Sequence, residues 1–302
     1  MNRAEETRFR GEPAVRLVAG ELAATFVPGL GMTGVSLRCR GREHLALPGG
    51  LDALRRGGTT GLPLLAPWAN RLGARRYRAA GVTVDLRGLR LHTDDNGLPI
   101  HGLLVGRPGW RVERVATRRG HPELVASIDI DAPAFPFPHR LTVAAQAHEQ
   151  RLVVDTTLRA TGRRRVPVAF GWHPYLRVPG TPRRAWRLRL PARTHLLLDD
   201  HGLPTGVTTR EDREDSRIGA QTFDDLYALG RDRRLAYVGD DGAFVELHAG
   251  TGFDHAQVWI PSGRPFGALE PMTSTTNALV DGSTPLVEPG DAYTARFALT
   301  VG

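Results

Sequence analysis

Five short segments place a histidine, a carboxylate or an arginine among apolar and turn-forming residues. They are "LAPWANRLGARRY" (65–77), "LPIHGLLVGRPGW" (98–110), "FGWHPYL" (170–176), "FDDLYAL" (223–229) and "FGALEPMTSTTNALVDG" (266–282). A polar side chain in such surroundings is either structural, with its hydrogen bonds satisfied, or it points into a pocket. We therefore expect the functional residues of the chain to come from these segments.

The strongest pattern for chemistry is a histidine and a glutamate. His173 stands between Trp172 and Pro174, with Tyr175 next, and such rigid neighbours hold an imidazole in one orientation. Glu270, in "GALEPM", is expected to be partly buried at the end of a strand. A buried carboxylate is costly unless it is paired, so it should have a partner or a raised pKa. These two residues predict an acid/base pair.

The other candidates have common structural explanations as well. His101, before a glycine, is of a type that more often sits satisfied in a loop or strand. Arg71, after Asn70, suits a structural ion pair, and Asp224 and Asp225 suit the capping of a turn. Considered singly, none of these residues establishes a function.

Several other chemistries have no support in the sequence. There is one cysteine, Cys39, and no HExxH spacing, so no metal site is predicted. The sequence has no GxSxG elbow of the serine hydrolases and no Walker-type loop, and nothing in it suggests a nucleotide cofactor. What is left is acid/base catalysis by a histidine and a carboxylate, without metal or cofactor.

The elements that must position these residues read as β-strands. Strand-like runs are frequent, are separated by Gly, Pro and Asp, and alternate with period two. In "RLVVDTTLRA", Leu152, Val154, Thr156 and Leu158 share one face, and residues 14–29 read as a hairpin. Only 51–57 suggests a helical turn. We predict an all-β fold, a large antiparallel β-sandwich, with residues 1–302 forming one domain.

Charge does not point to a nucleic-acid partner. The 302 residues have a formal charge of +8, carried by 40 arginines and no lysine. These arginines are scattered, whereas nucleic-acid binders concentrate charge on one face and interleave aromatic residues. A solvated arginine-rich surface explains the charge, and clustered arginines leave an anionic small substrate possible.

The sequence predicts a soluble protein of the cytoplasm with no membrane contact. Its N-terminal stretch is polar, without the apolar region of a signal peptide, and no apolar run is long enough to cross a bilayer. The single cysteine fits a reducing compartment. A monomer or a homodimer is expected.

Taken in order, the motifs resemble the aldose 1-epimerase (galactose mutarotase) family. The similarity rests on "PWANR" (67–71), "HGL" (101–103), "GWHPY" (171–175), "DDLY" (224–227), "EPMT" (270–273), "NAL" (277–279) and "PG" (289–290). It extends from about residue 14 to the C-terminus. Each motif is short, but their order on an all-β pattern is difficult to assign to another family.

The resemblance implies roles for three catalytic residues and a reaction. His173 would be the general acid, Glu270 the general base, and His101 would hold the sugar near its ring oxygen. Mutarotation opens a hemiacetal ring by removing the proton of the anomeric hydroxyl and protonating the ring oxygen. We expect ionised Glu270 to take the first proton and a resting His173 imidazolium to supply the second. No cofactor is needed.

The resemblance also implies how the sugar would be bound. Arg71, with Asn70 beside it, would contact sugar hydroxyls, and the position relative to the following aromatic favours Asp224 over Asp225. Trp172 is expected to contribute an apolar surface for the sugar, a role that Trp68 or Trp259 would also suit. The expected partner is therefore a small-molecule sugar.

Two alternatives to a mutarotase of free aldoses remain. Arg75 and Arg76 follow Arg71 closely, and if either pointed into the site, the substrate could be a hexose 6-phosphate or another anionic sugar. The "PWANR" motif favours the non-phosphorylated branch. The second alternative is a carbohydrate-binding protein without catalysis on the same scaffold, although a binder needs no matched acid and base.

Overall fold

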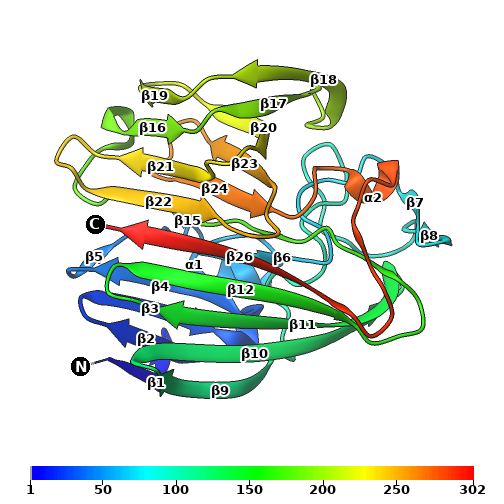
Figure 1. Ribbon diagram of the computed structural model, residues 1–302, viewed down its shortest axis with the longest axis horizontal. Helices are drawn as coiled ribbons and strands as arrows, with labels where there is room; N and C mark the ends of the chain where they lie inside the picture. Colours follow the sequence, from blue (N-terminus) through cyan, green and yellow to red (C-terminus); the bar gives the residue numbers. More distant parts are fainter. Residues whose placement is uncertain (1) are drawn as a thin grey trace.

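The chain forms three extended antiparallel sheets in a computed structural model that describes residues 2–302 (Figure 1). The largest sheet has nine strands in the order β19-β16-β21-β22-β26-β12-β11-β10-β9. Its strands are β9 (Arg111–Arg118), β10 (His121–Ala132), β11 (Phe135–Ala147), β12 (Arg151–Ala160), β16 (Arg187–Leu190), β19 (Glu214–Arg217), β21 (Arg234–Val238), β22 (Phe244–Ala249) and β26 (Ala292–Val301).

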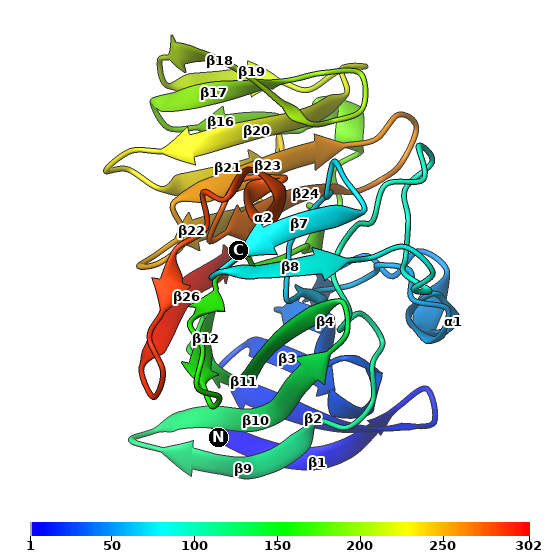
Figure 2. The ribbon, with the colours of Figure 1, turned by 90° about the vertical axis from the view of Figure 1, so that its right-hand side faces the viewer.

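Two further sheets lie along the nine-stranded sheet (Figures 1 and 2). The five-stranded sheet runs from β1 to β5: β1 (Arg3–Phe9), β2 (Glu12–Ala19), β3 (Leu22–Val27), β4 (Thr33–Cys39) and β5 (Arg42–Glu43). The eight-stranded sheet contains β6 (Leu64–Leu65), β14 (Gly171–Trp172), β15 (Tyr175–Leu176), β17 (Arg193–Leu198), β18 (Pro204–Glu211), β20 (Phe223–Leu229), β23 (His255–Ile260) and β24 (Gly267–Met272).

The remaining elements are short. Two small antiparallel pairs are formed by β7 (Arg76–Ala79) with β8 (Val82–Asp85), and by β13 (Val166–Pro167) with β25 (Leu286–Val287). The helices are α1 (Gly50–Arg55), α2 (Ala278–Asp281) and the 3-10 turns Pro28–Leu30 and Arg183–Ala185. No helix within residues 2–302 is long and apolar enough to cross a membrane.

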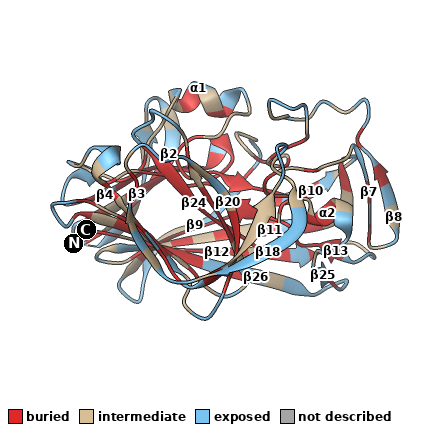
Figure 3. Cartoon of the chain, turned by 90° about the horizontal axis from the view of Figure 1, so that it is seen from above, coloured by how far each residue is buried: buried red, intermediate tan, exposed pale blue. Residues whose placement is uncertain are grey.

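The layers are held together by apolar side chains that alternate along the strands. In β11, every second residue from Phe135 to Ala147 is buried, and the positions between them are more exposed. Buried positions run through the interior between the sheets, whereas exposed positions lie on the outer loops and on outer strands such as β18 (Figure 3). Burial of this apolar surface is the main driving force for such packing.

This architecture confirms the predicted all-β antiparallel fold. The residues expected to share one face of β12, which include Leu152 and Leu158, are all buried. The predicted hairpin at 14–29 corresponds to β2 and β3, and the predicted helical turn at 51–57 corresponds to α1. The sequence did not predict α2, which has only four residues and begins after Asn277, in a left-handed conformation with φ of 71°.

Candidate active site

Six of the seven predicted site residues line one cavity of about 180 Å³. The cavity lies at the eight-stranded sheet and the loops beside it. Its lining consists of Thr59, Asn70, Arg71, Ile100, His101, His173, Tyr175, Asp224, Gln257, Trp259 and Glu270. Three larger hollows, of about 830, 650 and 270 Å³, lie at the nine-stranded and five-stranded sheets, and none of the predicted residues lines them.

The strand register of the sheet brings the cavity residues of β20, β23 and β24 together. Gln257 of β23 lies opposite Glu270 of β24, and Asp224 of β20 lies opposite Trp259 of β23. Residues two apart on a strand share a face, so Gln257 and Trp259 point the same way. Asp225 points away from the cavity, and its Oδ1 lies 3.5 Å from His195 Nε2. The structure therefore places Asp224, and not Asp225, in the lining.

Two loops supply the opposite side, and their backbones are joined. His101 N–H donates to the Asn70 carbonyl over 3.0 Å, and both residues adopt positive φ angles, of 62° and 56°. Gly102 also has a positive φ, and a Cβ at this position would overlap the Ala66 carbonyl. The glycine after His101 is therefore required by the close approach of the two loops, which fixes His101 and Asn70 relative to each other.

His173 and Glu270 face each other at the base of the cavity. The distance between His173 Nε2 and Glu270 Oε1 is 3.4 Å, and the two residues are 5% and 2% exposed. The imidazole stacks on the Tyr175 ring, with centroids 4.6 Å apart, and Trp259 meets it edge-on at 5.4 Å. Glu270 Oε2 has no hydrogen-bond partner among residues 2–302, so it is free to bind a ligand in the cavity.

Burial favours the uncharged forms of both groups. It lowers the pKa of His173 to about 3 and raises the pKa of Glu270 well above its ordinary value, an effect to which Asp224 adds and which Arg71 opposes. These directions oppose the expected resting imidazolium, because desolvation is the largest influence on the pKa of His173. His101 behaves similarly, since burial and then the nearby His173 lower its pKa.

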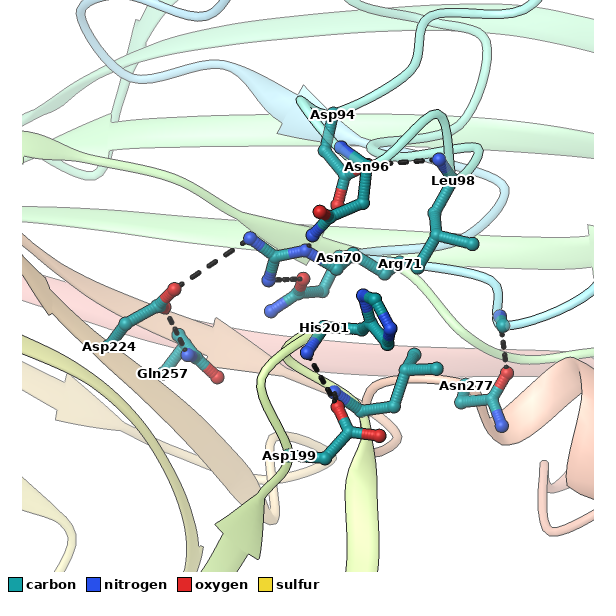
Figure 4. Close-up of polar contacts among 12 residues, drawn as sticks. Asn70, Arg71, Asp94, Asn96, Leu98, Asp199, His201, Asp224, Gln257 and Asn277 are labelled. Carbon is teal, nitrogen blue, oxygen red and sulfur yellow. Dashed lines mark hydrogen bonds and ion pairs between the residues drawn. The ribbon is translucent and has the colours of Figure 1, made fainter.

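Arg71 lies at the mouth of the cavity among oxygen acceptors (Figure 4). Its Nε donates to Asp94 Oδ2 over 2.7 Å and its Nη1 to Asn70 Oδ1 over 3.1 Å. Its Nη2 lies 3.7 Å from Asp224 Oδ2, and Gln257 Nε2 donates to the other oxygen of Asp224 over 2.6 Å. The guanidinium charge is thus balanced by two carboxylates.

Trp172 is the one predicted site residue that lies outside the cavity. Its side chain is fully buried in the core, where Nε1 donates to Thr156 Oγ1 over 3.0 Å and the ring packs against Phe297 at 5.6 Å. Trp172 cannot contact a ligand in the cavity from this position, so its predicted contact with a sugar is corrected. Its neighbour His173 points into the cavity, as residues of opposite parity do along an extended chain.

Sequence reasoning missed Thr59 and Gln257. The Thr59 Oγ1 lies 2.6 Å from the Tyr175 hydroxyl, within hydrogen-bonding distance, at the cavity wall. Gln257 is only 1% exposed, and the one signal for it is an amide in the apolar strand run "HAQVWI". Arg75 and Arg76 do not line the cavity, and Arg75 Nη2 donates to the Gly97 carbonyl instead.

Nothing in the described part of the chain suggests a metal centre. Residues 2–302 contain no group of three or more His, Cys, Asp or Glu side chains arranged to hold a metal ion. The rings of His101 and His173 form a T-shaped pair, with centroids 5.5 Å apart. The arrangement offers a proton donor, a proton acceptor and several hydroxyl-binding groups around one small volume.

An all-β sandwich that holds a buried histidine–glutamate pair in a small polar cavity has the features of an acid/base site, and comparison places the chain within a family. The model of the aldose 1-epimerase family matches residues 25–300, so the chain belongs to this family. No curated protein matches the sequence.

Solved structures share the fold over nearly the whole chain. A galactose mutarotase-like protein from Clostridium acetobutylicum is 18% identical, with a TM-score of 0.88 and coverage of 99% of this chain and 98% of that one. A galactose 1-epimerase from Lactobacillus acidophilus is 13% identical, with a TM-score of 0.78 and coverage of 100% and 98%. An aldose epimerase homologue from C. elegans is 15% identical, with a TM-score of 0.77 and coverage of 100% and 99%.

The position of Trp172 predicts that it contributes to stability and not to binding. The Trp172→Phe variant should unfold with a free energy lower by about 2 kcal/mol, because it loses packing volume and a buried hydrogen bond. Its KM for a sugar should stay at the wild-type value. Trp259→Phe, in the cavity wall, should show the reverse pattern. Urea unfolding and steady-state kinetics measure both, and a raised KM with unchanged stability in Trp172→Phe would contradict the assignment.

Proposed function

We propose that this protein is a mutarotase that interconverts the α and β anomers of a free aldose. The observation that carries the proposal is the 3.4 Å contact between His173 Nε2 and Glu270 Oε1 in a cavity of about 180 Å³. Ring opening needs one proton acceptor and one proton donor beside two neighbouring oxygens of the sugar, and these two groups offer both from one place. Membership of the aldose 1-epimerase family supports the same reaction.

The reaction consists of two proton transfers and one bond cleavage. Glu270 removes the proton from the anomeric hydroxyl while His173 gives a proton to the ring oxygen. The bond between the anomeric carbon and the ring oxygen breaks, and the anomeric carbon becomes an aldehyde. Rotation about the adjacent C–C bond presents the other face of the aldehyde, and the two transfers in reverse close the ring. Nothing is oxidised and no group leaves.

The pKa directions of His173 and Glu270 are compatible with this scheme. A neutral imidazole with a protonated Glu270 holds the same one proton as an imidazolium with an ionised Glu270. Burial favours the first form. Sugar hydroxyls bring hydrogen bonds that favour the charged form, so the proton moves from Glu270 to His173 when the substrate is bound. The pair therefore titrates as a unit, with one shared proton in its active state.

The remaining cavity residues suit the binding of a polyhydroxylated ring. Arg71, Asn70 and Gln257 offer N–H donors, and Asp224 offers an acceptor, around the same volume. The Trp259 ring and Ile100 supply apolar surface for one face of the sugar. We assign His101 to the side of the ring oxygen, because its ring lies beside that of His173.

Charge balance favours a neutral substrate over a sugar phosphate. Arg71 is the only arginine in the lining formed by the described residues, and Asp94 and Asp224 offset its charge. A phosphate would have to displace these carboxylates. A binding protein without catalysis is also less suitable, since burying an imidazole against a carboxyl group is costly and serves no purpose for recognition alone.

Polarimetry tests the proposal directly. Addition of the protein to freshly dissolved α-D-glucose or α-D-galactose should speed the approach to equilibrium rotation in proportion to enzyme concentration. The same assay with D-glucose 6-phosphate should show a smaller effect. Acceleration with the phosphate alone would transfer the assignment to a sugar-phosphate 1-epimerase, and binding of sugar without any acceleration would indicate a carbohydrate-binding protein.

Removing either member of the pair should abolish turnover without abolishing binding. Each positioned proton transfer contributes on the order of 10²–10⁴-fold in rate, so Glu270→Gln and His173→Asn should each lower kcat at least 100-fold. Glu123→Gln and His139→Asn are matched controls, because both residues are buried but lie outside the cavity. Wild-type kcat in a pair variant, with both controls active, would refute the acid/base assignment.

The shared proton predicts a wide pH plateau. The free pair gains a second proton only near pH 3, because burial lowers the pKa of His173 to about 3. It loses its single proton only well above the ordinary range of a carboxyl group, because burial raises the pKa of Glu270. A plot of kcat/KM against pH, which reports on the free enzyme, should therefore stay flat through pH 6.5. An acidic limb centred near pH 6.5 would show an unperturbed histidine instead.

A further inference from the structure

Arg71 is approached by two turns of nearly identical sequence from distant parts of the chain. One is "DDNGL" at 94–98, between β8 and β9, and the other is "DDHGL" at 199–203, between β17 and β18. In Figure 4, the Arg71 side chain lies between Asp94 on one side and the turn that contains Asp199 and His201 on the other. Neither turn contributes a residue to the cavity lining.

The two turns share one hydrogen-bond pattern. In each, Oδ1 of the first aspartate accepts from the backbone N–H groups two and four residues later, over 3.0 and 2.9 Å at Asp94 and 2.9 and 2.9 Å at Asp199. In each, the glycine has a positive φ, of 76° at Gly97 and 72° at Gly202. These local hydrogen bonds stabilise the conformation of both turns.

The first turn holds Arg71 by charge. Asp94 Oδ1 is used by the turn itself, which leaves Oδ2 to accept from Arg71 Nε over 2.7 Å. The Asp94 side chain is only 9% exposed, so this ion pair is shielded from water. Burial opposes ionisation of Asp94, but the hydrogen bonds from Arg71 and from the turn lower its pKa overall.

The second turn holds Arg71 by steric contact. A Cβ built on Gly202 would lie 2.7 Å from Arg71 Nη1 and 2.9 Å from Cζ, so the glycine backbone is packed directly on the guanidinium. Gly206, on β18 of the same hairpin, also has a positive φ, of 84°, but a Cβ there would meet nothing within 4 Å. Gly202 and Gly206 therefore share a positive φ, and they differ in that only Gly202 contacts Arg71.

We propose that these two turns form a clamp that orients the Arg71 guanidinium toward the sugar, with Asp94 and Gly202 as its positioning residues. Asp94 accepts a hydrogen bond from Nε, and the backbone of Gly202 packs against Nη1 and Cζ. With the guanidinium held in this way, Nη1 lies beside Asn70 and Nη2 beside Asp224, both of which line the cavity. An arginine side chain loses considerable rotamer freedom when it binds a ligand, and a clamp removes this cost before the sugar arrives. The clamp's effect on sugar binding rests on the proposed function.

The experiment compares two variants with matched controls in the full-length protein. Gly202→Ala places a methyl group against the guanidinium, and Gly206→Ala carries the same penalty of positive φ without the contact. Asp94→Asn keeps Oδ1 for its turn but removes the ion pair, and Asp95→Asn removes a charge from the same turn at an exposed position. Crystal structures of the variants and KM and kcat for the mutarotation of D-galactose are measured.

The clamp predicts a change in KM with little change in kcat. Gly202→Ala and Asp94→Asn should each raise KM about tenfold, the size expected when a charge-assisted hydrogen bond to the substrate is weakened. Both controls should keep the wild-type KM. In the crystal structures, the distance from Arg71 Nη2 to Asp224 Oδ2 should increase from 3.7 Å in the two clamp variants only.

The outcomes separate failure of the clamp from failure of the proposed function. If the wild type catalyses mutarotation but Gly202→Ala and Asp94→Asn match their controls in KM, the clamp is overturned. If the wild type shows no mutarotation, the proposed function fails, and the crystal structures still decide about the clamp. A guanidinium that stays in place in both clamp variants overturns the proposal whatever the activity.

Discussion

The buried contact between His173 and Glu270 is the interaction on which the rest of the site depends. Two ionisable groups, each almost completely shielded from water, lie 3.4 Å apart. Desolvation pushes both toward their neutral forms, and their proximity lets one proton serve both. The protein keeps this costly arrangement in the lining of a cavity, and ionisable groups with such perturbed pKa values cluster at functional sites.

The antiparallel sheet fixes the relative position of His173 and Glu270. Glu270 lies in the fully buried strand β24, between β23 and the short strands β14 and β15 that flank His173. Because neighbouring strands are locked by backbone hydrogen bonds, the side chains of β20, β23 and β24 that face the cavity stay in fixed register. The histidine is held from the other side, where its backbone N–H donates to the Pro63 carbonyl over 3.1 Å.

The loops beside the sheet contribute charged and polar side chains to the cavity. The segments that contain Asn70 and His101 are joined through their backbones, and Arg71 is surrounded by Asp94, Asp224 and the glycine of a second turn. Loops that are so tightly connected can carry binding groups as reliably as strands do. The balanced charge around Arg71 suits recognition of neutral hydroxyls, which accept and donate hydrogen bonds but do not need a net positive partner.

The sequence by itself determined the fold class and the residue types at the site, because period-two alternation and local motifs are properties of neighbouring residues. Tertiary structure alone decided that Trp172 enters the core while His173 enters the cavity, that Gln257 joins the lining, and that burial favours the neutral forms of His173 and Glu270. Side-chain direction in a two-residue strand and the degree of desolvation depend on segments far away in the chain, which no local pattern records.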